Sequence, residues 1–167
     1  MPDEEPAIRR IEEHESAAVV ELWDRMARGV PGGGPLPERG RRNLRRMLEI
    51  SSWHRDVFCL VAVPADCDAP VGFAMGSVDD GGGLLPGLAG EVEEVYVPAD
   101  RYGADDLRRQ LAKAVVSELN ARGCTSTIRV LMDAEDTASR ILFEDLGFEA
   151  DIVVLSLYQH MGRTVSP

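Results

Sequence analysis

Cysteine is scarce in this 167-residue chain, and the three that are present, Cys59, Cys67 and Cys124, share no spacing typical of a metal site. An odd number of widely separated cysteines also argues against a disulfide framework. No apolar run approaches the roughly 20 residues that a membrane-spanning helix needs. The first ten residues have neither the basic start nor the apolar stretch of a secretion signal. We therefore expect a cytoplasmic protein that has no membrane partner.

Positive charge is also limited. The chain has 18 Lys and Arg residues against 29 Asp and Glu residues, a formal net charge of −11. Such an excess of acidic groups argues against nucleic-acid binding and favours a cationic or amine ligand over an anionic one. An acidic surface also serves solubility, so the charge by itself does not select a substrate.

Several catalytic patterns are missing. The sequence has no Ser-His-Asp order, no metal-ligand spacing and no phosphate-binding loop of the Walker type. Its three histidines, His14, His54 and His160, lie in segments typical of the surface. We expect no metal site.

What the sequence does contain is a regular alternation of strand and helix patterns in one domain spanning residues 1–167. Apolar runs or alternation predict strands over 7–11, 57–63, 71–78, 91–97, 128–132 and 152–158. A helix capped by Ser16 and further helices over 38–50, 105–122 and 136–146 are predicted from the helical period. Residues 30–35, rich in glycine and proline, are expected to form a loop.

The order of these elements predicts an α/β domain. The uninterrupted apolar run over 57–63 is typical of a central strand that is buried on both faces. A strand pair over 57–78 and a strand-helix-strand unit over 91–132 together imply a mixed sheet with helices on both faces.

Two segments also carry a family resemblance. Residues 91–101, with the sequence EVEEVYVPADR, resemble the fourth strand and following turn of the GNAT N-acetyltransferases. Residues 136–148, with the sequence DTASRILFEDLGF, resemble a later helix of that family, which ends in Gly-Phe. Their spacing and the order of the elements agree with the GNAT-like fold, a central mixed sheet flanked by helices on both faces.

The resemblance implies acetyl-CoA as cosubstrate and a small-molecule or peptide amine as acceptor. The coenzyme would lie in a V-shaped opening between the fourth and fifth strands, bonded to the main chain of the fourth strand and to a following helix N-terminus. The positions implied to contact it are Val95, Tyr96, Val97, Tyr102, Gly103, Ala104, Asp106, Leu107, Arg108, Asp136, Ser139 and Phe143.

The resemblance also implies a carboxylate base on the fourth strand. We select Glu93 first and Glu91 second. In an ideal strand Glu91 and Glu93 share one face and Glu94 points to the other, unless a bulge intervenes.

The sequence departs from the family at the coenzyme loop and in the later helix. A gap-free match places Tyr102, Asp105 and Leu107 where the family has Arg or Gln, Gly, and Gly or Ala. Phe143 stands where the family often has a proton-donating Tyr. Three interpretations therefore remain: an N-acyltransferase, a binding or regulatory module that has lost the coenzyme, and a different enzyme on the same scaffold. Only 19 residues follow Phe148, too few for the family's last strand pair, which suggests a homodimer.

Overall fold

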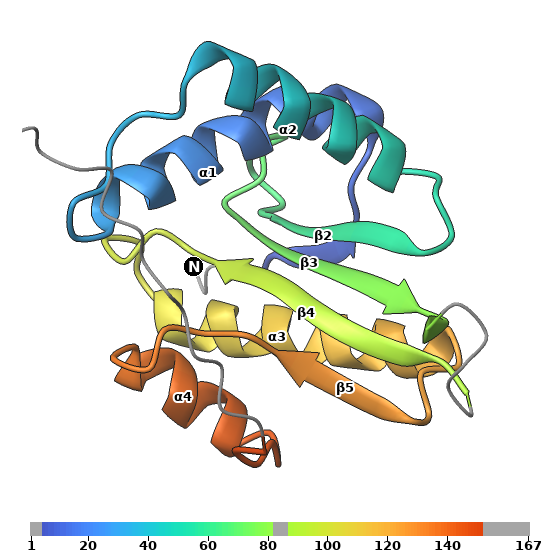
Figure 1. Ribbon diagram of the computed structural model, residues 1–167. Coiled ribbons are helices and arrows are strands. Elements are labelled where there is room, and N and C mark those ends of the chain that lie inside the picture. Colours follow the sequence, from blue (N-terminus) through green and yellow to red (C-terminus); the bar gives the residue numbers. More distant parts are fainter. Residues whose placement is uncertain (1–4, 82–86, 152–167) are drawn as a thin grey trace, which may run out of the picture.

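The computed structural model describes residues 5–81 and 87–151, and it contains a five-stranded sheet with helices on both faces (Figure 1). The elements in chain order are β1 (Ala7–Arg10), η1 (Glu13–Glu15), α1 (Ser16–Gly29), α2 (Glu38–Ser51), β2 (Val57–Val63), β3 (Gly72–Asp79), β4 (Ala89–Tyr96), α3 (Ala104–Ala121), β5 (Thr127–Val130) and α4 (Thr137–Glu144).

The sheet is mixed, as the sequence predicts. Its strands follow the order β1-β2-β3-β4-β5, and each of the first four is antiparallel to its neighbour. The last strand, β5, is parallel to β4, and α3 makes the crossover between them.

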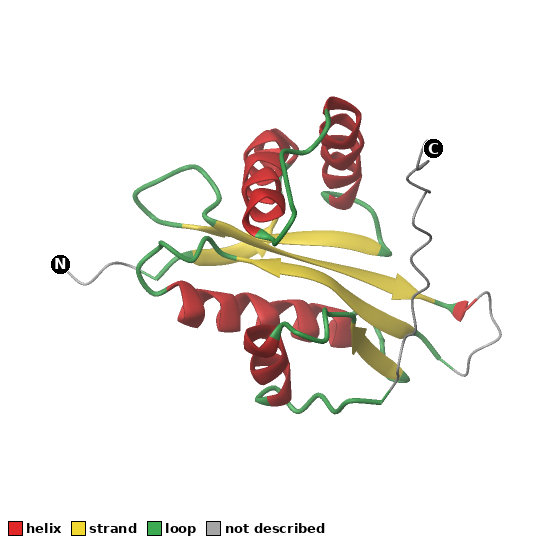
Figure 2. Cartoon of the chain, turned by 60° about the vertical axis from the view of Figure 1, so that its left-hand side comes forward, coloured by secondary structure: helices red, strands yellow, loops and turns green. Residues whose placement is uncertain are grey.

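Two apolar cores lie on opposite faces of this sheet. On one face α1 and α2 pack over Cys59, Val61, Phe73 and Met75. On the other face α3 packs over a larger core, and α4 contributes Leu142 and Phe143 to it. Figure 2 shows the helices above and below the sheet. Alternate residues of β2 enter the two cores, which confirms the prediction of a strand buried on both faces.

One glycine lets α3 approach the sheet closely. A β-carbon at Gly76 on β3 would lie 2.6 Å from the Phe58 ring and 3.0 Å from a methyl group of Val115 on α3. Since real β-carbons do not approach other atoms so closely, the contact between β3 and α3 requires glycine at this position.

Some local predictions were wrong. The Ser16 hydroxyl does not cap α1, because it donates to the Glu13 carbonyl at 2.7 Å. A short 3-10 helix, η1, precedes α1, and the Glu15 carboxylate accepts the Glu12 N–H at 2.8 Å. The predicted strand over 152–158 lies outside the described residues.

Candidate active site at the divergence of β4 and β5

The two parallel strands β4 and β5 separate part of the way along β4. Residues Ala89–Val92 pair with Thr127–Val130, whereas β4 continues to Tyr96 paired only with β3. In Figure 1 the two strands start side by side and diverge toward the ends at their arrowheads. The β5-facing edge of β4 from Glu93 to Tyr96 therefore has no partner strand among the described residues. An unpaired strand edge is a template for a ligand that carries amide groups.

A bulge in β4 decides which way its carboxylates point. Met75 lies opposite Glu94, but the next residue of β3, Gly76, lies opposite Val92, so Glu93 is the extra residue. Directly opposite residues share a face of the sheet, and Met75 belongs to the core beneath α1 and α2. The bulge therefore places Glu94 on the α1 and α2 face, where an ideal strand would have pointed it to the other face.

The two residues that we selected as bases lie on this same face. Glu91 lies opposite Ser77, and the Glu93 carboxylate accepts the Ser77 hydroxyl at 2.5 Å. Glu93 is exposed to solvent, whereas Glu91 and Glu94 are half-buried.

Glu94 has the most distinctive environment of the three carboxylates. Burial raises its pKa, and the nearby charge of Asp136 adds to the rise. Two interactions lower the pKa but do not cancel this rise. The Val95 N–H donates to the Glu94 carboxylate at 3.1 Å, and Arg108 contributes a nearby positive charge. A carboxylate with a raised pKa is a better general base near neutral pH. Strand alternation alone points Glu94 to the other face, so it favours Glu93 and Glu91 as bases.

The N-terminus of α3 borders the same opening. Gly103 precedes the helix with a φ of 70°, a left-handed conformation that favours glycine. The main-chain N–H groups of Asp105 and Asp106 have no hydrogen-bond acceptor in the part of the chain that is described. Free N–H groups at a helix N-terminus, together with the helix dipole, attract anions.

Neither large side chain of the altered loop blocks this helix end. Tyr102 is 93% exposed and extends into solvent, and Leu107 is buried in the core against the sheet. The carboxylates of Asp105 and Asp106 are exposed. The loop therefore leaves its main chain accessible, although it lacks the glycines of the family pattern.

A hydrogen-bond chain connects α3 to α4. Arg108 donates to the Ser139 hydroxyl at 2.5 Å, and this hydroxyl donates to the Asp136 carboxylate at 2.5 Å. Asp136 also accepts the Ser139 N–H at 3.0 Å, so it caps α4. Burial raises the pKa of Asp136, but the two Ser139 bonds and the charge of Arg108 outweigh this and lower it overall. These hydrogen bonds hold the Arg108 cation beside the N-termini of both α3 and α4.

The other residues implied by the family resemblance lie nearby or in the core. Tyr96, the last residue of β4, is half-buried and contacts the Phe73 ring at 5.9 Å between ring centres. The side chains of Val97 and Phe143 are buried in the α3-side core, where Phe143 contacts Phe148 edge-on at 5.3 Å. Ala104, the first residue of α3, is half-buried.

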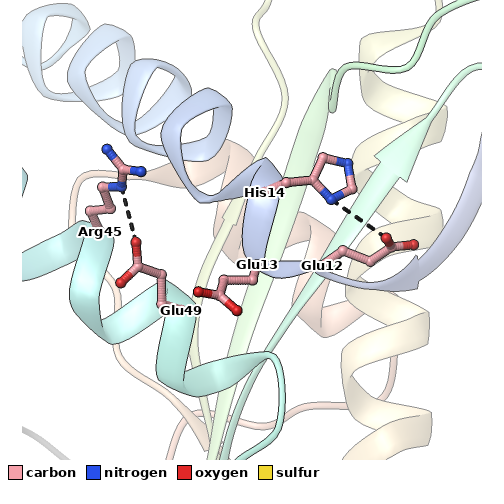
Figure 3. Close-up of a pocket in the computed structure, with 5 residues that line it drawn as sticks. All are labelled: Glu12, Glu13, His14, Arg45 and Glu49. Atoms are coloured by element: carbon pink, nitrogen blue, oxygen red, sulfur yellow. Dashed lines mark hydrogen bonds and ion pairs between the residues drawn. The ribbon is translucent and has the colours of Figure 1, made fainter.

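A separate hollow lies at the surface between η1 and α2 (Figure 3). Its lining is polar and consists of Glu12, Glu13, His14, Arg45 and Glu49. Arg45 pairs with Glu49 at 3.0 Å, and His14 lies 3.5 Å from Glu12. No residue of β4, β5, α3 or α4 lines this hollow, so it is distinct from the opening described above.

Within residues 5–81 and 87–151, no group of three or more His, Cys, Asp or Glu side chains is placed to hold a metal ion. No helix in that part of the chain has the length and apolar character needed to cross a membrane.

Comparison with known proteins gives a consistent result. No protein-family model matches the chain. The mycothiol acetyltransferase of Kocuria rhizophila is 35% identical over 116 residues, which are 68% of this chain and 37% of that protein. The chain therefore spans little more than a third of the length of that relative.

Solved structures resemble the whole domain. An aminoglycoside N-acetyltransferase in complex with CoA superposes with a TM-score of 0.70 at 20% identity, covering 97% of this chain and 99% of its own. An aminoglycoside acetyltransferase from a soil metagenome, in complex with sisomicin, gives 0.66 at 15% identity, covering 93% of this chain and 96% of its own. An acetyltransferase of Trypanosoma brucei gives 0.65 at 20% identity, covering 92% and 99%. At these identities the structures share the fold.

A mixed sheet whose fourth and fifth strands diverge beside two helix N-termini has the architecture of a GNAT-type acyltransferase. The local sequence similarity to an acetyltransferase agrees with this architecture. The chain has the fold of the GNAT superfamily.

Proposed function

We propose that the protein is an N-acyltransferase that transfers an acetyl group from acetyl-CoA to the amine of a small molecule or peptide. The observation that carries this proposal is the opening between β4 and β5, which the N-termini of α3 and α4 border. The CoA complex of a structural neighbour with the same fold supports acetyl-CoA as the cosubstrate. The proposal includes a cytoplasmic location and a homodimer as predictions that remain to be tested.

The residues present fit the coenzyme in spite of the altered loop. The unpaired edge of β4 from Glu93 to Tyr96 offers main-chain groups to an amide-bearing arm, with the Val95 N–H already donating to the Glu94 carboxylate. The N–H groups of Asp105 and Asp106 and the cation of Arg108 offer positive potential to a diphosphate. A binding module without coenzyme is less favoured, because neither Tyr102 nor Leu107 occupies the opening.

We assign the role of general base to Glu94 rather than to Glu93 or Glu91. An amine must be neutral to attack a thioester, and a half-buried carboxylate with a raised pKa can accept its proton. In the reaction the amine nitrogen bonds to the acetyl carbon, the carbon–sulfur bond breaks, and the leaving thiolate takes up a proton from solvent. Phe143 cannot donate that proton because its side chain has no ionisable group.

The acceptor is proposed to be a cationic amine. Glu91, Glu93 and Glu94 share one face of β4, and the net charge of the chain is −11. Both features favour a positively charged molecule. Two structural neighbours act on aminoglycosides, which are small-molecule amines.

The test is a screen of primary amines for acetyl-CoA-dependent thiol release, with Glu94→Gln and Glu93→Gln as paired variants. We expect turnover by the native protein and by Glu93→Gln, and loss of turnover in Glu94→Gln. Equal loss in both variants would reject Glu94 as the base. If no amine in the screen is acetylated, the proposed activity is rejected.

A further inference from the structure

We propose that Asp24 is a positioning residue for the amine acceptor, because its buried carboxylate fixes the loop over residues 30–37 on the face of the sheet that bears Glu94. This inference rests on the proposed function. Asp24 lies on α1, is 5% exposed, and has no place in the acyl-transfer chemistry itself.

The carboxylate of Asp24 is fully engaged. One oxygen accepts the Leu36 N–H at 2.7 Å, and the other accepts the Arg28 Nε–H at 2.7 Å. Arg41 on α2 lies 3.3 Å from the first oxygen. The hydrogen bond from Arg28, followed by that from Leu36, lowers the pKa of Asp24, so the group is charged near neutral pH.

The loop has few other attachments. Gly33 donates to the carbonyl of Val30 within the loop at 2.9 Å, and Leu36 donates to Asp24. For residues 31–36, the bond to Asp24 is the one hydrogen bond to another element within the described part of the chain. The position of the loop therefore depends strongly on this carboxylate.

A second contact sets the loop against the end of α1. A β-carbon at Gly33 would lie 2.0 Å from the carbonyl oxygen of Ala27. Only glycine allows the main chain to pass so close to the helix. The loop is thus held at two points, by Gly33 against Ala27 and by Leu36 on Asp24.

The loop lies on the face of the sheet where the amine would bind. Leu36 packs against the core that contains Phe73 and Met75, and Tyr96 packs against the same core. Met75 lies opposite Glu94 in the sheet. A displaced loop would therefore change the surroundings of the proposed base on the acceptor side.

The neighbouring residue makes a separate connection. Arg25 pairs with Asp100, which follows β4 before the turn into α3, at 2.6 Å. This pair is exposed, so it contributes little to stability. Two adjacent residues of α1 thus make different contacts. Asp24 holds the loop over residues 30–37 through a buried carboxylate, whereas Arg25 pairs with Asp100 in an exposed position.

Three variants separate positioning of the loop from general damage to the fold. Asp24→Ala removes both carboxylate oxygens that accept hydrogen bonds. Asp24→Asn retains one oxygen that can accept the Leu36 N–H. Gly33→Ala displaces the loop without altering a charge. Glu49→Gln, which removes a carboxylate from an exposed pair on α2, is the matched control. Each variant is studied by hydrogen exchange of residues 30–36, by calorimetric titration with CoA, and by kinetics with the best amine from the screen.

We expect faster exchange of the loop and a rise of about tenfold in the acceptor KM for Asp24→Ala and Gly33→Ala, the size typical of one lost charge-assisted hydrogen bond. The CoA affinity of these variants should stay within about twofold of the native value. For Asp24→Asn, both the loop exchange and the acceptor KM should lie between those of Asp24→Ala and the native protein. Glu49→Gln should behave as the native protein does. Unchanged loop exchange in Asp24→Ala, or faster exchange with an unchanged acceptor KM, would overturn the inference. Failure of the native protein to bind CoA would instead reject the proposed function, and the positioning role with it.

Discussion

Met75 on β3 lies opposite Glu94 on β4, while the next residue of β3 lies opposite Val92. The intervening bulge at Glu93 turns Glu94 to the face covered by α1 and α2, at the point where β5 has ended. The half-buried position raises the pKa of the carboxyl group, which makes Glu94 suited to accept a proton from an amine.

Glu94→Gln should lower kcat by about 10²–10⁴-fold, the usual contribution of a general base. Glu91→Gln and Glu93→Gln should change kcat by less than about tenfold. Because a base acts in its deprotonated form, activity should fall as the pH decreases through the raised pKa of Glu94, above the ordinary value of about 4.3. Measurement of kcat/KM from pH 4 to 9 for the native protein and the three variants tests these expectations. If the activity of Glu94→Gln still falls at low pH, the titrating group is not Glu94.

The affinity for CoA should fall when a positive charge is removed from the proposed coenzyme site and rise when a negative charge is removed. Arg108→Gln should weaken CoA binding by about tenfold, since it removes a cation near the helix N-termini. Asp106→Asn should strengthen binding at low salt, because it removes an exposed carboxylate beside the free N–H groups. Calorimetric titration at two salt concentrations measures both changes.

Arg109→Gln is the control for these titrations. Arg109 is adjacent to Arg108 but pairs with Asp145 at 3.0 Å in an exposed position. It should leave the CoA affinity nearly unchanged. An equal effect of both arginine variants would show that general charge, and not the position of Arg108, governs binding.

Glu15 should contribute to stability in a pH-dependent way. Its carboxylate is almost fully buried and accepts two hydrogen bonds from Arg9, at 2.9 and 2.8 Å. Burial raises the pKa of Glu15, but the bond and charge of Arg9 and the Glu12 N–H outweigh it, so the pKa in the folded protein is lowered. A depressed pKa stabilises the folded state above the unfolded-state value of about 4.3, and this contribution is lost as the pH falls through the folded-state pKa.

Glu15→Gln should therefore cost about 2–3 kcal/mol of unfolding free energy at pH 7, since it leaves a buried pair incomplete. The difference from the native protein should shrink below about pH 4. Urea unfolding at pH 7 and at pH 3.5 provides the comparison, and a difference that is equal at both pH values would contradict the assigned role of the charge.

Gly76→Ala and Gly40→Ala should have opposite effects on stability. A β-carbon at position 76 meets the buried Phe58 ring at 2.6 Å and should destabilise the protein by about 1–3 kcal/mol. Gly40 lies within α2, where a β-carbon meets nothing closer than Pro37 at 3.4 Å, so alanine should stabilise by about 0.5–1 kcal/mol. Thermal and urea unfolding of the two variants measure the contrast.

The fold was predictable because its strongest signals are local. The apolar run over 57–63 and the helical period of α3 each identify an element that tertiary packing then retains. Predictions from local sequence patterns were wrong where a neighbouring side chain makes a competing hydrogen bond. The Glu15 carboxylate, paired with Arg9, accepts the Glu12 N–H and so caps the start of η1, the short helix that precedes α1 where Ser16 alone suggested a helix cap.

The candidate site was predictable only in part. The family resemblance indicated β4 and both helix N-termini. An ideal strand points Glu94 away from the face of Glu91, and the bulge that was left open as an alternative places both on one face. Asp24 did leave a signal that sequence analysis passed over. It follows Val20 by four residues on the buried stripe of α1, where a charged side chain requires partners.

Isothermal titration of the native protein with CoA determines whether the altered loop still serves the coenzyme. We expect one binding site per chain with micromolar affinity, together with thermal stabilisation by the ligand. No detectable heat, with no thermal stabilisation at millimolar CoA, would contradict this expectation.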